Sequence, residues 1–411
     1  MKRAALLAMP FALLPPAVLA SPGNVPHIVH VIHVGLSLFC AAAAVFGIIY
    51  MVAAGVLIRR FFARAPAEPD SFPPVTIIKP LRGQERMLLD NLSSFCRQDY
   101  PGPVQFLFGV QDSGDPALEI LNQLRIVHPE AQITVVSDSR SCGPNRKMSN
   151  ILNMLPQVLH DVLVFADSDV GVEHGYLRHV VGELQKPDVG LVTCLYRGQP
   201  APGLWPRLSA MATNYQFVPG VVTGLALGLA RPCFGQTIAT RRATVERIGG
   251  FLQFAHHLAE DHAIGKAVRE AGEKVAIPPF VVTHACVEAD ATELLAHELR
   301  WSRTIRTIDP IGHLGSVLTY PLIFSALAAL ASGGAAWSLA LVLTAVLARL
   351  LLKWQIDRAT CQPYRDAWLL PIWDLLSFCI FVASFFSRRV VWRGFSFEVS
   401  GNGLLHPVKK D

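Results

Sequence analysis

The sequence predicts an α/β domain joined to membrane-spanning helices at both ends. Between residues 75 and 165, short apolar segments typical of buried strands alternate with segments of helical periodicity, which indicates a largely parallel sheet. Hydrophobic residues make up 52% of the 411-residue chain and charged residues only 16%, with a mean hydropathy of +0.38. An ordinary soluble protein is less apolar, so membrane segments are expected.

Two apolar segments open the chain. Residues 1–3 carry positive charge and precede a short apolar segment with small residues near Ala20, which resembles a signal peptide. A longer apolar run, about 29–58, can span a bilayer, and the arginine pair at 59–60 predicts that its C-terminal end is cytoplasmic. The first segment is therefore either cleaved or the outward arm of a helical hairpin.

The central region carries the alternation of strands and helices. The predicted strands lie within 75–83, 104–116, 133–138, 162–165, 189–196 and 274–284, and the predicted helices within 88–102, 117–129, 256–272 and 293–310. A Gly/Asn loop at 141–150 opens a further helix, and 234–251 reads as a strand, a helix and a glycine stop. The apolar stretch 217–232 contains Pro219 and several glycines, which favours an interfacial or substrate-facing segment over a span.

The C-terminal part holds three apolar candidates for spans, about 314–331, 335–352 and 367–386. If all three crossed the membrane, the basic C-terminus would lie outside, against the positive-inside tendency. We therefore expect one of them to be re-entrant or interfacial. The basic residues concerned are Arg388, Arg389, Arg393, Lys409 and Lys410. The expected regions are an N-terminal anchor (1–60), a cytosolic domain (70–312), a C-terminal membrane region (313–390) and a tail (391–411).

Charge and cysteine usage exclude several function classes. The net charge of +5 is mild, and the positive residues lie beside apolar runs rather than among aromatics, so no nucleic-acid partner is expected. None of the eight cysteines forms a C-x-x-C pair, which argues against a zinc knuckle or a redox motif. Scattered cysteines of this kind suit reduced thiols in a cytosol-facing protein.

A pair of carboxylates follows the predicted strand 162–165. Asp167 and Asp169 stand one residue apart, where an open α/β sheet binds its ligands, and such acids suit a hard divalent cation shared with substrate phosphates. An ordinary Asx-type turn is the alternative interpretation. Further polar groups are expected at the same edge of the sheet: Asp112, the Glu260–Asp261 pair, and His297 with Arg300 and Trp301. Together they offer a metal site, a base and a cation for a departing charge, as a nucleotide-sugar reaction requires.

Motifs over residues 70–320 carry a specific resemblance. In order they are KPLRG (79–83), SFCRQDYPGPVQ (94–105), FGVQD (108–112), GPNRKMSN (143–150), ADSD (166–169), GLVTCLYRG (190–198), LALGLARPCFG (225–235), IGGF (248–251), AED (259–261) and HELRW (297–301). The chain resembles membrane-anchored glycosyltransferases of the Rossmann-like GT-A fold, in the ceramide glucosyltransferase family (family 21). Within that family it is similar to bacterial hopanoid glycosyltransferases that make bacteriohopanetetrol glucosamine.

The resemblance implies a role for each matching residue. Asp261 would be the catalytic base. Asp112, Lys147, Asp167, Arg300 and Trp301 would bind the nucleotide-sugar, and Asp169, with Asp167, would hold Mg²⁺ or Mn²⁺. Related enzymes often have Gln where this chain has His297, so whether His297 contacts phosphate or only packs stays open.

The resemblance further implies an inverting, UDP-sugar-dependent hexosyltransferase in the bacterial inner membrane, with its catalytic domain facing the cytoplasm. The leading hypothesis is transfer of N-acetylglucosamine from UDP-GlcNAc to a membrane lipid, bacteriohopanetetrol. A UDP-glucose-dependent ceramide glucosyltransferase is the near alternative. A processive polysaccharide synthase would need more spans, and a non-catalytic scaffold would not need the complete set of acids.

Overall fold

The computed structural model describes residues 25–361, 366–386, 389–392, 395–399 and 404–407. The signal-like segment before residue 25 lies outside these ranges, as do Arg388, Arg393 and the lysines at 409–410 of the basic C-terminus. The chain divides into two compact units, one of residues 1–51 and 318–349 and the other of residues 52–317 and 350–411.

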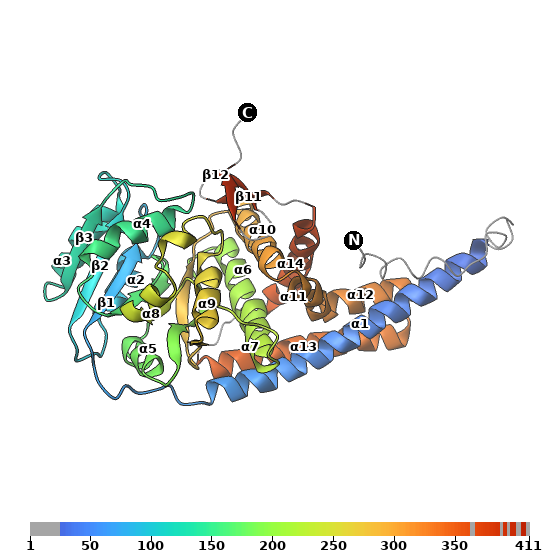
Figure 1. Cartoon of the computed structure of the whole chain (residues 1–411). Helices are drawn as coiled ribbons and strands as arrows, with labels where there is room; N and C mark the ends of the chain where they lie inside the picture. The colour runs from blue at the N-terminus through green and yellow to red at the C-terminus, as the bar shows by residue number, and fades with distance from the viewer. Residues whose placement is uncertain (1–24, 362–365, 387–388, 393–394, 400–403, 408–411) are drawn as a thin grey trace. The chain divides into compact units, whose positions relative to one another are not determined.

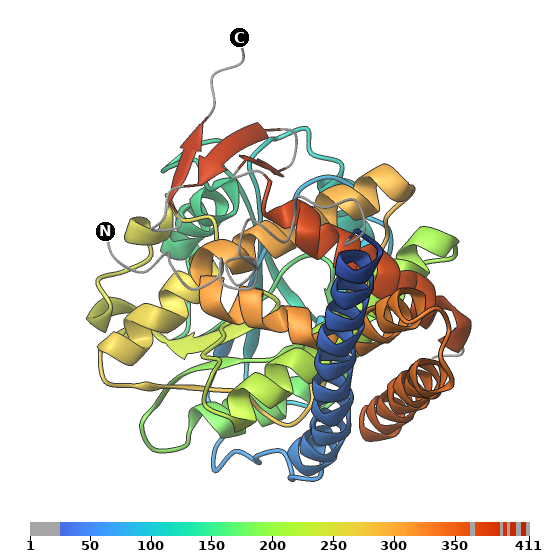
Figure 2. The same cartoon turned by 90° about the vertical axis from the view of Figure 1, so that its right-hand side faces the viewer.

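The first unit is helical. It holds most of α1 (Val25–Phe62), a single continuous helix, together with α12 (Pro321–Ala331) and the first half of α13 (Ala336–Ala359) (Figure 2). A Cβ at Gly47 would lie 2.6 Å from the carbonyl oxygen of Leu318 and 2.9 Å from Cβ of Pro321. Glycine at this position therefore lets α1 approach the start of α12 closely.

The second unit is built on a mixed seven-stranded sheet in the order β3-β2-β1-β4-β8-β6-β9 (Figure 1). These strands are β1 (Val75–Pro80), β2 (Val104–Val110), β3 (Gln132–Ser137), β4 (Val162–Phe165), β6 (Val189–Thr193), β8 (Ile238–Arg241) and β9 (Lys274–Ala276). The first four neighbours pair in parallel, as predicted, whereas β8 runs antiparallel to both β4 and β6. The predicted α/β class is confirmed, with a sheet less uniformly parallel than expected.

Helices cover both faces of this sheet. Side chains of α2 (Leu88–Cys96), α3 (Ala117–Val127) and α5 (Tyr176–Leu184) form one apolar core with strand residues such as Ile77. Those of α4 (Arg146–Met154) and α9 (Glu260–Glu270) form a second core with the next residue, Ile78. Successive side chains of a strand point to opposite faces, so the continuous apolar runs in the sequence reflect burial on both sides.

A second, three-stranded sheet has the order β5-β10-β7, with β5 (Val170–Gly171), β7 (Leu195–Pro200) and β10 (Val281–Cys286). The sequence predicted one strand over 274–284, and this prediction was wrong. Pro278 and Pro279 interrupt the segment, because proline cannot donate to a strand ladder. As a result β9 ends in the large sheet, and β10 begins in the small one.

The second unit also contains further helices, and the last strands make a small antiparallel sheet. The helices are α6 (Leu204–Ala212), a π-helical turn (Thr213–Phe217), α7 (Val218–Ala226), α8 (Arg242–Arg247), α10 (Ala291–Ile308), α11 (Pro310–Gly315) and α14 (Leu370–Ser384). The strands are β11 (Arg389–Trp392), β12 (Phe395–Val399) and β13 (Leu405–Pro407).

Among the described residues, three helical segments are long and apolar enough to cross a membrane: Val29–Phe62, Ala336–Ala359 and Ala367–Ser384. A fourth candidate, Pro310–Thr319 followed by Pro321–Ala331, is bent by 58° at its break. It is therefore a broken span or a re-entrant loop, and only the second of these would match the prediction of one re-entrant or interfacial segment. These segments indicate a membrane protein.

Candidate active site

One cavity of about 870 Å³ brings the predicted site residues together. Its lining includes Asp112, Lys147, Asp167, Asp169, Asp261, His297, Arg300 and Trp301. They come from the carboxyl ends of β2 and β4, from the first turns of α4 and α9, and from one face of α10. The prediction that these polar groups share one edge of the sheet agrees with this geometry.

Asp167 is held by a lysine on a neighbouring helix. Lys147 Nζ lies 2.6 Å from Asp167 Oδ1 and 3.0 Å from Glu260 Oε1. Burial opposes the charge of the lysine, but the carboxylates of Asp167 and Glu260 raise the pKa of Lys147 above its usual value. Lys147 is therefore a fixed cation at the floor of the cavity.

Asn145 sets the geometry of that lysine. It is the N-cap of α4, where its Oδ1 accepts a hydrogen bond of 3.0 Å from the backbone N–H of Met148. Its Nδ2 donates to Glu260 Oε2 at 3.0 Å. One side chain thus starts the helix that carries Lys147 and orients the carboxylate that pairs with it.

Asp169 lies beside a histidine that the sequence did not single out. His284 Nδ1, from β10, lies 3.5 Å from Asp169 Oδ2, too long for a strong hydrogen bond but close enough for an ion pair. Burial alone would raise the pKa of Asp169, but the positive charge of His284 outweighs it and lowers the pKa to about 2. Asp169 is therefore ionised across the physiological range.

The carboxylates fit part of a divalent cation site. Asp169 Oδ1 is buried and has no hydrogen-bond partner, which is costly for a carboxylate oxygen unless a ligand satisfies it. Within the described part of the chain, no group of three His, Cys, Asp or Glu side chains is placed to hold a metal. The protein would thus supply one or two oxygens and leave further positions to substrate phosphates and water, as is common for Mg²⁺.

Asp261 is the acid best placed to take up a proton. Its Oδ2 accepts a hydrogen bond of 2.9 Å from the backbone N–H of Gly235, and its Oδ1 accepts one of 2.7 Å from that of His262. Burial and the adjacent negative charge of Glu260 raise the pKa of Asp261 to about 7. A carboxylate tuned to this range is an effective general base near neutral pH.

Asp112 forms a turn and also lines the cavity. Its Oδ1 accepts a hydrogen bond of 3.0 Å from the backbone N–H of Gly114, which is an Asx turn. The same side chain is exposed and lines the cavity. The turn therefore presents the carboxylate at the rim of the site.

The α10 residues form an aromatic wall. The Trp301 ring lies edge-to-face with His297 at 4.8 Å and with Tyr196 at 6.0 Å, measured between ring centroids. Arg300 lines the same cavity one residue away. His297, Arg300 and Trp301 share one helix face because residues three and four apart are neighbours on a helix surface.

The sequence pointed to the acids but missed the residues that brace them. Lys79 is fully buried and donates a hydrogen bond of 2.8 Å to the backbone carbonyl of Asp167. Its ammonium also lies 3.7 Å from the centroid of the Phe95 ring. A lysine inside an apolar strand was the available signal, because lysine is almost never fully buried without a specific partner.

Apolar residues also line part of the cavity. Phe217 and Val221 line it from the segment before and within α7, and Ile305 and Ile308 line it from α10. Beyond α7, Leu227 and Leu229 are 61% and 75% exposed. Phe217 and Val221 belong to the stretch 217–232, which the sequence predicted as an interfacial or substrate-facing segment.

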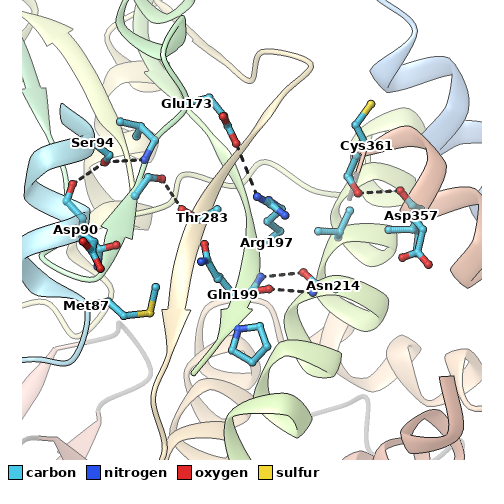
Figure 3. A pocket seen from close by; sticks show the side chains of 18 of the residues that line it. Met87, Asp90, Ser94, Glu173, Arg197, Gln199, Asn214, Thr283, Asp357 and Cys361 are labelled. Carbon is cyan, nitrogen blue, oxygen red and sulfur yellow. Dashed lines mark hydrogen bonds and ion pairs between the residues drawn. The ribbon is translucent and has the colours of Figure 1, made fainter. Parts of the chain in front are cut away.

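A second cavity, of about 640 Å³, lies on the opposite face of the three-stranded sheet (Figure 3). Arg197 and Thr283 line it, whereas the preceding and following residues, Tyr196 and His284, line the first cavity. This alternation follows from the period of two in a strand. The candidate active site therefore occupies only one face of the small sheet.

Comparisons with known proteins identify the family of the chain. The model of Glycosyl transferase family 21 matches residues 39–405. Ceramide glucosyltransferase 1 of Caenorhabditis elegans is 22% identical over 254 residues, covering 62% of this chain and 53% of that protein. The ceramide glucosyltransferase of Candida albicans is 36% identical over 120 residues, covering 26% and 22%. The chain thus spans about half the length of the C. elegans relative.

Among solved structures, a mannosyltransferase from Pyrobaculum calidifontis in complex with GDP-Man and Mn²⁺ is similar, with a TM-score of 0.49 and 19% identity. The similarity covers 87% of this chain and 99% of that one. The family model matches most of the chain, including both the cavity and the apolar helices. The chain therefore belongs to glycosyl transferase family 21.

Proposed function

We propose that this protein is an inverting glycosyltransferase that moves a hexose from a UDP-sugar to a hydroxyl group of a ceramide-like membrane lipid. The observation that carries the proposal is the composition of one cavity. It combines Asp261, whose pKa is about 7, with the cation of Lys147 and the ionised Asp169. These groups suit a single displacement at the anomeric carbon of a sugar diphosphate, in which a general base removes the proton of the attacking hydroxyl group.

In the proposed reaction, Asp261 takes the proton from the acceptor hydroxyl. The hydroxyl oxygen then forms a bond to the anomeric carbon, and the bond from that carbon to the UDP oxygen breaks. Attack from the face opposite UDP inverts the anomeric centre and yields a β-glycoside. The hydrogen bonds from the backbone of Gly235 and His262 hold the base in place for this step.

The diphosphate leaves with its negative charge, which cationic groups must stabilise. Lys147 is fixed in the cavity, and Arg300 can pair with a phosphate through two parallel hydrogen bonds. Asp169, with Asp167, would hold a divalent cation, which would neutralise part of the diphosphate charge. Asp112, at the rim, would contact the nucleoside.

The lipid nature of the acceptor is supported by two features. Apolar residues of α7 and α10 line part of the cavity, and Leu227 and Leu229 leave an exposed apolar surface just before the lining residue Ala230. The curated relatives are named ceramide glucosyltransferases, which favours a ceramide-like acceptor and UDP-glucose over the hopanoid and UDP-GlcNAc reading.

The test uses the full chain purified in detergent with Mg²⁺ or Mn²⁺. UDP-glucose and UDP-GlcNAc are each offered with ceramide and with bacteriohopanetetrol, and the products are identified by mass. We expect a ceramide hexoside from UDP-glucose. A product formed only from UDP-GlcNAc and bacteriohopanetetrol would overturn the proposed substrates. If the folded protein turned over none of the four substrate pairs, the proposed transferase activity would be overturned.

A further inference from the structure

Glu288 is a buried acid that the reaction above does not use. It lies between β10 and α10, is only 7% exposed, and precedes His297 by nine residues. Its Oε1 accepts a hydrogen bond of 2.8 Å from Ser209 Oγ, on α6, and lies 2.7 Å from His297 Nδ1. Three elements therefore converge on one carboxylate oxygen.

This contact determines which nitrogen of His297 carries the proton. Burial alone would raise the pKa of Glu288, but the hydrogen bond from His297 lowers it below the usual value, so the carboxylate is ionised. An ionised carboxylate only accepts hydrogen bonds, so Nδ1 of His297 must be the donor. Burial lowers the pKa of His297 and the hydrogen bond to Glu288 raises it, but burial together with the charge of Arg300 prevails, so the ring is neutral and Nε2 keeps its lone pair.

The Nε2 atom is available to a substrate. His297 lines the active-site cavity, and among the described residues its ring nitrogens have only one hydrogen-bond partner, Glu288 at Nδ1. The edge-to-face contact with Trp301 and the bond to Glu288 fix the plane of the ring. A fixed lone pair in a cavity selects a group that can donate a hydrogen bond.

We propose that Glu288 is a positioning residue that holds His297 in the Nδ1–H form, so that Nε2 accepts a hydrogen bond from a hydroxyl group of the bound substrates. The inference rests on the proposed glycosyl transfer and assigns His297 a role within it. Phosphate oxygens offer no donor at neutral pH, so His297 recognises a hydroxyl rather than the diphosphate. The hydroxyl belongs either to the hexose or to the lipid acceptor.

Two substitutions at His297 separate its two nitrogens. In His297→Asn, the shorter amide reaches the position of Nδ1 and can still donate to Glu288, but nothing replaces Nε2. In His297→Gln, the longer amide reaches the position of Nε2 and offers an acceptor oxygen there, but the contact with Glu288 is lost. We expect the asparagine variant to keep more of the thermal stability and the glutamine variant to keep more of the activity.

In numbers, His297→Asn should lose about tenfold in kcat/KM, the effect of one missing hydrogen bond, with a Tm close to that of the wild type. His297→Gln should lose less in kcat/KM and more in Tm. A rise in KM for the UDP-sugar assigns the hydroxyl to the hexose, and a rise in KM for the lipid assigns it to the acceptor. Equal losses of kcat/KM in both variants, or losses that follow Tm, would overturn the inference.

The tautomer is tested without turnover. In the full chain labelled with ¹⁵N-histidine, the unprotonated nitrogen of His297 should be Nε2, with the signal assigned by its loss in His297→Gln. Glu288→Ala should give a mixture of tautomers, whereas Glu288→Gln, which keeps an acceptor oxygen, should remain folded and preserve the wild-type form. Unprotonated Nδ1 in the wild type would overturn the inference even if the enzyme is active. If no substrate pair turns over, the proposed function fails while this measurement still decides the tautomer.

Discussion

The backbone N–H of Gly235 donates a hydrogen bond of 2.9 Å to Oδ2 of Asp261, the proposed base. A Cβ at position 235 would lie 2.8 Å from Lys147 Nζ, 3.4 Å from Asp167 Oδ2 and 3.6 Å from Asp261 Oδ2. Gly235 therefore stands where the proposed base and the lysine–aspartate pair come closest to one backbone atom. The proposed catalytic groups thus lie around one glycine.

Replacing Gly235 with alanine should displace the flexible end of Lys147 and leave the fold intact, because the clash is with the tip of a long side chain. Without a fixed ammonium, we expect affinity for UDP to fall about tenfold, measured by calorimetry, since one charge-assisted contact is lost. Gly220→Ala on α7 is the matched control, because a Cβ there meets nothing within 4 Å. Unchanged UDP affinity in Gly235→Ala would contradict this role of Lys147.

Asp261→Asn should abolish transfer and leave UDP binding largely intact. The amide cannot accept the proton of the acceptor hydroxyl, and general-base catalysis typically contributes about 10²–10⁴-fold. Product formation is measured by mass and UDP binding by calorimetry. Asp161→Asn, at an acid whose side chain is 88% exposed, serves as the control. Transfer at the wild-type rate would remove Asp261 as the base.

Activity should rise with pH through about pH 7. Below this value Asp261, whose pKa is raised to about 7, carries a proton and cannot act as a base, and above it the carboxylate is free. The measurement is kcat/KM between pH 5 and 9, about two units on either side of the expected midpoint. A flat profile would contradict the assignment.

The same shift has the opposite effect on stability. Burial raises the pKa of Asp261 from 3.8 when unfolded to about 7 when folded, so the folded state holds the proton more tightly. Stability contributed by this group is therefore present below about pH 4 and lost as the pH rises to about 7. We expect a difference in Tm between wild type and Asp261→Asn that changes across this window, whereas a constant difference would argue against a perturbed acid.

A divalent cation should increase the affinity for UDP, and the increase should depend on Asp169. Mn²⁺ added to chelator-treated protein is expected to tighten UDP binding in the wild type but not in Asp169→Asn, because the buried Oδ1 would lose its charge. Binding is followed by calorimetry, so the result does not depend on turnover. An equal effect of Mn²⁺ on both proteins would place the cation elsewhere.

Charged substitutions at the exposed leucines that follow α7 should weaken the binding of the lipid acceptor but not the binding of the nucleotide-sugar. Leu227→Asp and Leu229→Asp place a charge on an apolar surface beside the cavity, so we expect KM for the lipid acceptor to rise several-fold and UDP affinity to stay the same. Leu159→Asp, at a leucine 59% exposed before β4, is the matched control. Unchanged KM for the lipid in both variants would exclude this path.

The sequence predicted the strands that are buried on both faces and the acids that follow them. β1, β2 and β4 carry apolar runs with clear ends, so the positions of Asp112 and Asp167 could be inferred before any geometry was known. The break after β9 was missed, although Pro278 and Pro279 stood in the predicted strand. The apolar pattern alone led to a predicted strand that continued past Pro278 and Pro279, although the backbone hydrogen bonds of a strand are interrupted at these prolines.

His284 and Glu288, the partners of Asp169 and His297, could not be predicted in the same way. His284 and Glu288 meet Asp169 and His297 only because β10 crosses into the small sheet, which is a property of the tertiary fold. No local spacing relates residue 284 to residue 169. Sequence patterns identify side chains that carry charge at element ends, whereas their partners depend on which elements the fold brings together.

The cavity-facing side of α10 has a consequence for how this family can change. His297, Arg300 and Trp301 line the cavity, and Ile305 and Ile308 continue its lining toward the C-terminal end of the helix. Each residue turns a helix by about 100°, so inserting or deleting one residue between Trp301 and Ile305 would rotate the apolar wall away from the opening. Single substitutions along α10 keep this spacing, whereas a change in the length of the helix between Trp301 and Ile305 would separate its polar part from its apolar part.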